Sequence, residues 1–216
     1  MQFDIITIFP ELFQPFLTTS VIKNAISKDI IKINIHNLRD YTNLKRKKVD
    51  DTSYGGGVGM ILMAQPIINA VNTIKQKERK SHVILLSPTN NYFNQRKAIN
   101  YANNFDQIIL ICGRYEGIDE RIKQLVVDET ISIGEYVLTG GELASMVIVD
   151  ATSRMIKGFF EKEDVLENES YSEDKFIEYP QYTKPEIIEG ISVPKVLLSG
   201  NHKEIKEWKE KHKIKY

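Results

Sequence analysis

The stretch that decides the fold runs from residue 108 to residue 142. Residues 108–121 read IILICGRYEGIDER, and residues 129–142 read ETISIGEYVLTGGE. Each part contains an apolar, β-branched run typical of a buried strand, followed by a glycine-containing loop. Glycine accepts positive φ and leaves no Cβ between the main chain and a ligand. The stretch predicts either a pocket lined by backbone groups or two ordinary turns of an α/β domain, and spacing alone leaves both open.

Strand-like and helix-like segments alternate along most of the chain. Apolar runs predict strands at 3–8, 31–35, 83–86, 107–111 and 126–133. Helical spacing predicts helices at 21–26, 67–74, 95–102, 118–124 and 141–156, and Pro10 is suited to begin a short helix. Residues 37–59 form a long polar, glycine-rich loop of a kind that is often functional. The alternation predicts an α/β domain with a largely parallel sheet.

Composition indicates a cytoplasmic protein. With 216 residues, 42% of them hydrophobic, the chain can form one domain of about 150 residues plus a small appendage. No apolar run approaches the roughly 20 residues that span a bilayer, and the N-terminus predicts a strand rather than a signal peptide. The single cysteine, Cys112, excludes an intrachain disulfide and suits a reducing cytosol. Because it ends an apolar run, we expect it to be buried.

Charge is unevenly distributed although the net charge is zero. Lys45–Lys48 is a basic block, residues 161–178 hold eight acids against two lysines, and residues 195–216 hold seven lysines against three glutamates. Such runs are usually solvated faces. The basic patches are also compatible with an RNA backbone.

The C-terminal part predicts a linker and a small domain. Residues 161–174 are acidic and lack hydrophobic periodicity, which favours a mobile linker. We expect a core around Ile187–Ile188 and Val196–Leu198, and a last helix at 202–213 with Ile205 and Trp208 on one face. The predicted organisation is a domain at 1–160, a flexible acidic linker at 161–176 and a small domain at 177–216.

Several familiar site motifs are absent. No G-x-G-x-x-G follows a strand, and there is no G-x-x-x-x-G-K-[ST] phosphate loop and no G-x-S-x-G elbow. The four histidines are scattered without metal-ligand spacing, so no metal site is predicted.

The two glycine loops carry motifs of a known family. Residues 112–121 read CGRYEGIDER and residues 132–142 read SIGEYVLTGGE. Further motifs lie in the same family's order at Val49–Asp51, 54–57 (YGGG), Gly59–Met60, Leu86–Pro88, Ser153–Arg154, 178–185 (EYPQYTKP), Val193–Pro194 and 197–202 (LLSGNH). Together they resemble the TrmD family of bacterial tRNA (guanine-N1)-methyltransferases, of the SPOUT class. The resemblance covers nearly the whole chain and implies an α/β methyltransferase domain with a trefoil knot, plus a small helical C-terminal domain that binds tRNA.

The resemblance implies S-adenosylmethionine as methyl donor, with its adenosine held by main-chain groups and apolar walls. Glu116 either offers charge complementarity to the sulfonium or caps a helix beginning at Ile118. The expected cofactor-binding residues are Leu86, Ser87, Pro88, Gly113, Tyr115, Glu116, Gly117, Ile133, Gly134, Glu135, Tyr136, Val137, Leu138, Gly140 and Gly141.

Methylation at guanine N1 requires removal of the N1 proton, a general-base role typically worth about 10²–10⁴ in rate. The family's base is the aspartate of an Asp-Ser-Phe triplet, which residues 169–171 (Glu-Ser-Tyr) resemble best, with Asp174 as the alternative. Arg154 matches the family's arginine that stabilises charge on O6. Without the resemblance, Glu169 is one more linker acid and Arg154 a surface residue at a helix end.

The resemblance also implies partners: guanosine 37 of tRNA, beside the anticodon and preceded by a guanosine, a dependence on Mg²⁺, and an obligate homodimer whose protomers share each site. The chain departs from the family by its glutamate at 169, about one extra residue before Pro180, and Lys175–Ile177 where Gly-Leu-Leu is usual. Two rivals remain: a knotted RNA methyltransferase acting on a ribose 2′-oxygen or another base, and an RNA-binding protein without catalysis.

Overall fold

The computed structural model describes residues 1–161, 169–171 and 176–215, and the chain divides into two compact units, Met1–Phe159 and Phe160–Tyr216. The first unit is built on a five-stranded sheet in the order β2–β1–β6–β5–β7, with every neighbouring pair parallel. These strands are β1 (Gln2–Thr7), β2 (Lys32–Asn37), β5 (Ser81–Leu86), β6 (Gln107–Cys112) and β7 (Glu129–Ile131). The predicted α/β class with a parallel sheet is confirmed; the trefoil knot stays a prediction.

The central strand β6 is apolar from Ile108 to Cys112 because both faces of the sheet are covered. In β6, Ile108 and Leu110 point into one hydrophobic cluster, and Ile109 and Ile111 point into the other. All four side chains are at most 1% exposed. The alternation follows from the two-residue period of a strand, so the continuous apolar run that the sequence shows is a buried central strand.

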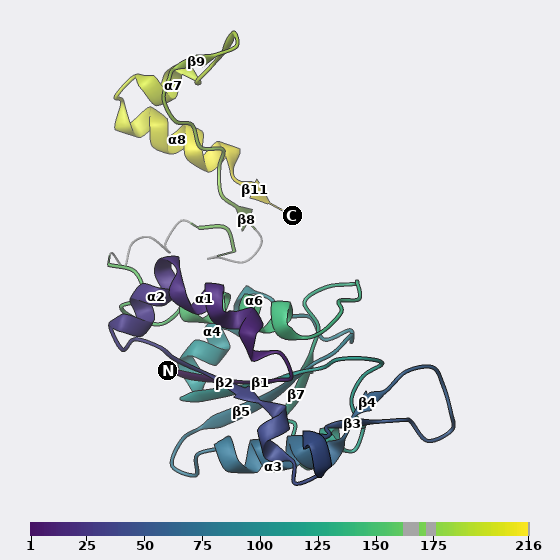
Figure 1. The fold of residues 1–216 in the computed structure, drawn as a ribbon. Coiled ribbons are helices and arrows are strands. Elements are labelled where there is room, and N and C mark those ends of the chain that lie inside the picture. The colour runs from purple at the N-terminus through teal and green to yellow at the C-terminus, as the bar shows by residue number, and fades with distance from the viewer. Residues whose placement is uncertain (162–168, 172–175, 216) are drawn as a thin grey trace. The chain divides into compact units, whose positions relative to one another are not determined.

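Helices cover both faces of this sheet (Figure 1). The helices α1 (Gln14–Thr18), α2 (Ser20–Ser27), α4 (Gln95–Asn104) and α6 (Glu142–Ser153) lie on one face, and α3 (Ala64–Ile74) lies on the other. Short helices complete the unit: η1 (Pro10–Phe13), η2 (Leu38–Tyr41), η3 (Lys45–Lys47) and α5 (Ile122–Leu125). Pro10 begins η1 as predicted, and the side chain of Asn94 caps α4 by accepting the amide of Lys97 at 3.0 Å.

One predicted helix is shorter than expected. Only Ile122–Leu125 is helical in the segment predicted to begin at Ile118, because the main chain around Ile118 pairs with a strand instead. Ile118 forms a parallel bridge with Leu62, whose amide donates to the carbonyl of Gly117 at 3.0 Å. Leu62 belongs to a short antiparallel pair of β3 (Asp50–Asp51) with β4 (Ile61–Leu62); β3 lies within the predicted loop and β4 follows it.

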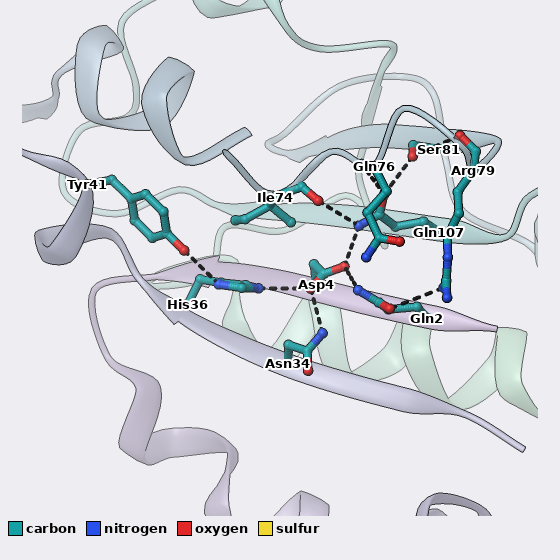
Figure 2. A network of polar contacts seen from close by, with 10 residues as sticks. All are labelled: Gln2, Asp4, Asn34, His36, Tyr41, Ile74, Gln76, Arg79, Ser81 and Gln107. Atoms are coloured by element: carbon teal, nitrogen blue, oxygen red, sulfur yellow. Dashed lines mark hydrogen bonds and ion pairs between the residues drawn. The ribbon is translucent and has the colours of Figure 1, made fainter. Parts of the chain in front are cut away.

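A buried carboxylate ties three strands together on the α3 face (Figure 2). Asp4 is 1% exposed, and its Oδ1 accepts from the amide of Asn34 at 2.8 Å and lies 2.9 Å from Nε2 of His36. Its Oδ2 accepts from the amides of Gln2 and Gln107, each at 2.7 Å. Burial alone raises the pKa of a carboxyl, but these hydrogen bonds outweigh burial and lower the pKa of Asp4.

The second unit is small and mixed. Its described residues form two antiparallel pairs, β8 (Phe176–Ile177) with β11 (Ile214–Lys215) and β9 (Ile187–Ile188) with β10 (Ile191–Ser192), together with α7 (Lys195–Leu198) and α8 (His202–His212). Phe176, which the predicted linker includes, is buried within β8.

The predicted core of this unit is only partly correct. Ile205 and Trp208 of α8 are partly buried, and Trp208 stacks on His212 with ring centres 4.0 Å apart. Ile187 and Ile188 are 59% and 56% exposed, so their assignment to the core was wrong. They lie in a hairpin of two-residue strands, which is too short to cover its own faces. Within the described parts of the chain, no helix is long and apolar enough to cross a bilayer.

A candidate cofactor site at the carboxyl edge of the sheet

A cavity of about 330 Å³ lies where β5, β6 and β7 end. Its walls are the segments that follow these strands: Leu86–Pro88 after β5, Gly113–Ile118 after β6, and residues after β7 up to Gly141. Ligands of parallel α/β sheets bind beyond the carboxyl ends of the strands, and this volume is typical of small-molecule pockets. The pocket interpretation of the glycine loops is therefore correct.

Most of the residues expected to bind a cofactor line this cavity. Gly134 and Glu135 do not line it. The carbonyl of Gly134 accepts from Ser132 Oγ at 2.8 Å, and the carboxylate of Glu135 accepts from the hydroxyl of Tyr92 at 3.1 Å. Those that line it are Leu86, Ser87, Pro88, Gly113, Tyr115, Glu116, Gly117, Ile133, Tyr136, Val137, Leu138, Gly140 and Gly141.

The cavity also has walls that the sequence did not single out. Arg114 and Thr139 belong to the two glycine loops, so their position within the motifs could have identified them as cavity residues. Ile61 belongs to β4, and no sequence pattern indicated that it would line the cavity. It lies at the cavity because Leu62, the next residue, pairs with Ile118. Glu120 and Lys123 form an exposed ion pair of 2.8 Å at the rim. The remaining additional lining residues are Leu85, Ile118, Ile131, Ser132 and Ala144.

Main-chain contacts join the two glycine loops. The amide of Gly141 donates to the carbonyl of Gly113 at 3.0 Å, and Arg114 forms an antiparallel bridge with Gly140. Gly117 has φ +137° and open space at its Cβ position, so a side chain there is disfavoured by backbone conformation. Cys112, at the base of the loops, is 2% exposed as predicted, and burial raises the pKa of its thiol, which is therefore neutral.

Glu116 lies at the cavity wall and does not cap a helix. Its amide donates to the carbonyl of Met60 at 3.1 Å, and α5 begins only at Ile122, so the capping alternative is wrong. Its side chain packs against Gly59, where an added Cβ would lie 2.7 Å from Cγ of Glu116. The alternative, that its carboxylate complements a positively charged ligand, stays a prediction.

Arg154 is distant from the cavity of its own chain. It directly follows α6, whose first residue, Glu142, adjoins the cavity loops. At about 1.5 Å per residue, Arg154 is roughly 18 Å farther along the helix axis. It is partly buried and is not part of the cavity wall.

Glu169 belongs to the second unit, where it is partly buried and precedes a turn. The amide of Tyr171 donates to the carbonyl of Phe176, and the amide of Glu178 donates to Oγ of Ser170, each at 3.0 Å. Asp174 lies outside the described residues. In the parts of the chain with described coordinates, no group of three or more His, Cys, Asp or Glu side chains is arranged to hold a metal ion.

The family model and the relatives that match this chain carry the same description. The family model described as tRNA (Guanine-1)-methyltransferase TrmD matches residues 1–216. Three relatives bear the name tRNA (guanine-N(1)-)-methyltransferase. That of Carboxydothermus hydrogenoformans is 48% identical, over 99% of this chain and 83% of the relative. The relative from Clostridioides difficile is 46% identical over 100% of this chain and 93% of its own length. The relative from Acholeplasma laidlawii is 50% identical over 97% of this chain and 84% of its own length.

Proposed function

The chain belongs to the TrmD family of tRNA (guanine-1)-methyltransferases, and we propose that it transfers a methyl group from S-adenosylmethionine to N1 of a guanosine in tRNA. The target implied by the resemblance is guanosine 37, beside the anticodon and preceded by a guanosine. The observation that carries the proposal is the cavity between two glycine loops that carry the family's motifs. We assign the reaction to the cytoplasm, in line with the single buried cysteine.

The cavity lining fits the donor. Main-chain N–H and C=O groups of the two loops suit the edge of an adenine, and Leu86, Ile133 and Leu138 provide apolar walls. Glu116 supplies a carboxylate that complements a sulfonium. When bound, S-adenosylmethionine supplies an electrophilic methyl group on positively charged sulfur.

The chain's own residues would activate the base. The N1 lone pair of guanine becomes available only when the N1 proton leaves, and we assign proton removal to the carboxylate of Glu169, with Asp174 as the alternative. Negative charge then builds on O6. We assign its stabilisation to the guanidinium of Arg154, a delocalised cation with a planar set of donors.

The position of Arg154 supports a site shared between two copies. In α6, Leu143 and Val147 are 61% and 46% exposed. Val147 lies four residues after Leu143, and Arg154 lies eleven residues after Leu143, so all three share one face of the helix. Exposed apolar side chains on a helix of a parallel α/β unit favour coverage by a partner. We propose that a second copy covers this face and that Arg154 serves the partner's cavity, with the anticodon stem-loop of tRNA bound across the pair.

Mg²⁺ dependence is also implied by the resemblance. Among the residues with described coordinates, no group of three or more His, Cys, Asp or Glu side chains is arranged to hold the ion.

The proposal is tested with donor carrying a labelled methyl group and an unmodified tRNA transcript that has guanosine at positions 36 and 37. Nucleoside analysis should find 1-methylguanosine, and a transcript with adenosine at 37 should remain unlabelled. A 2′-O-methylated nucleoside would instead favour the ribose-methylating rival. Binding of the transcript without donor binding or methyl transfer would favour the RNA-binding rival.

A further inference from the structure

A buried carboxylate connects the glycine loops to the end of β1. Oε2 of Glu142 accepts from Nε of Arg114 at 3.0 Å, and Oε1 accepts from Oγ1 of Thr7 at 2.7 Å. Glu142 is 2% exposed and Thr7 is 1% exposed. Arg114 lines the cavity, but neither Thr7 nor Glu142 does. The pair therefore lies directly behind a cavity wall without reaching the ligand space.

Further contacts fix the guanidinium of Arg114 in one orientation. Its Nη1 donates to the carbonyl of Thr139 at 3.3 Å, so one side chain joins the loop after β6 to the loop after β7. Its Cζ lies 4.6 Å from the ring centre of Phe9, whose own amide donates to Oγ1 of Thr7 at 2.9 Å. The main-chain separation of the two loops thus depends on a set of contacts centred on Glu142.

Glu142 has little freedom to rearrange. It is the first residue of α6, where the helix dipole favours a negative charge, and both carboxylate oxygens are hydrogen-bonded. Removing its charge would leave Arg114 without its partner beside the cavity, a costly arrangement for a partly buried cation.

Resting on the proposed function, we propose that Thr7 and Glu142 are positioning residues for the methyl donor. They hold Arg114, and through it the carbonyls and amides of both glycine loops, in the spacing that binds the donor. They touch neither donor nor RNA. Their loss should therefore weaken donor binding more than it slows transfer at saturating donor.

The sharpest test is Thr7→Val, which removes the hydroxyl with little change of volume, compared with Thr7→Ser, which retains the hydroxyl. A hydrogen bond to a charged group is worth enough to predict an increase of about tenfold in the Kd and KM for S-adenosylmethionine. With kcat at saturating donor expected to change by no more than about twofold, the loss would be one of binding. Thr7→Ser should restore affinity to within about twofold of the unmodified protein. Thr73→Val is the matched control, because the Thr73 hydroxyl donates only to the carbonyl of Asn69 on the exposed side of α3.

Affinity is measured by calorimetry and transfer by steady-state kinetics with tRNA. Unchanged donor affinity in a folded Thr7→Val protein, or a loss confined to kcat, would overturn the inference while leaving the proposed function intact. Absence of donor binding by the unmodified protein would instead refute the proposed function. Should Thr7→Val not fold, Glu142→Gln replaces it, since it keeps the side-chain size, removes the charge and carries the same expectation.

Discussion

Gly141 lies against Cys112 with no room for a side chain between them. A Cβ added to Gly141 would lie 2.7 Å from Cα of Cys112 and 3.1 Å from the amide nitrogen of Gly113. The main chain at the start of α6, where Gly141 is the N-cap, is therefore packed directly against the main chain at the end of β6. This contact, rather than loop flexibility, explains why glycine occupies the position that closes the cavity.

Gly141→Ala should disturb both the fold and the cavity. Because backbone atoms cannot move aside as a flexible side chain does, we expect a stability loss of about 1–3 kcal/mol in urea denaturation, as for other overpacked sites. The two loops should also separate, so donor affinity in calorimetry should fall at least about tenfold.

Gly113→Ala is the matched comparison for this prediction. Gly113 also lines the cavity, but its added Cβ would meet the carbonyl of Leu86 at 3.4 Å, close to an ordinary contact. Its stability loss should be clearly smaller. Equal losses of stability in the two variants would show that the close approach of Gly141 to Cys112 does not cause the destabilisation by Gly141→Ala.

Glu169→Gln should lower turnover by about 10²-fold or more while leaving donor affinity unchanged, because the amide cannot accept the N1 proton. Single-turnover methyl transfer to a tRNA transcript measures this directly. Asp174→Asn should have the smaller effect. The opposite order would transfer the base to Asp174, and full activity of the double variant would remove the linker acids from the reaction.

Arg154 should act on the cavity of the other copy. Arg154→Ala and Gly141→Ala, each alone, should have low activity. Equal mixtures of the two chains, denatured and refolded together, should recover about a quarter of normal activity, since half of the dimers are mixed and each of these has one intact site. No recovery would place Arg154 in the site of its own chain. Size-exclusion chromatography checks that the dimers form.

Glu129 should make stability depend on pH. Burial alone raises its pKa, but hydrogen bonds from Lys97 at 2.5 Å, Tyr101 at 2.6 Å and Asn91 at 3.0 Å, together with His82, lower it from 4.5 to about 2. The folded value lies below the unfolded one. Glu129 therefore stabilises the fold above about pH 4.5, and this contribution disappears as the pH falls towards 2.

The stabilisation at stake is on the order of 2–3 kcal/mol. The Glu129→Gln protein should lack this stabilisation at pH 7. Its free energy of unfolding should fall less steeply between pH 4.5 and 2, with the remaining slope due in part to Asp4. Urea denaturation across this range measures both. Glu120→Gln removes an exposed partner of Lys123 and should change stability by less than about 1 kcal/mol. A similar loss in both variants would refute the role of the Glu129 cluster.

Local sequence patterns predicted the sheet well and the cavity in large part. The apolar run of β6 and the glycines after it are neighbours in sequence, so periodicity and motif sufficed. The Arg114–Glu142 pair, the pairing of Ile118 with Leu62 and the cluster around Asp4 were missed, because each depends on residues far apart in the chain. The exposure of Ile187 could not be predicted either, since its apolar character alone does not reveal that a hairpin is too short to bury it.

The central claim is that the two glycine loops hold the methyl donor. The most direct measurement is a crystal structure of the protein with S-adenosylhomocysteine, the demethylated product. The adenosine should lie between residues 113–117 and 133–141, with its adenine edge hydrogen-bonded to main-chain groups and its apolar contacts to Leu86 and Leu138. An empty cavity, with the ligand ordered elsewhere on the protein, would contradict the claim.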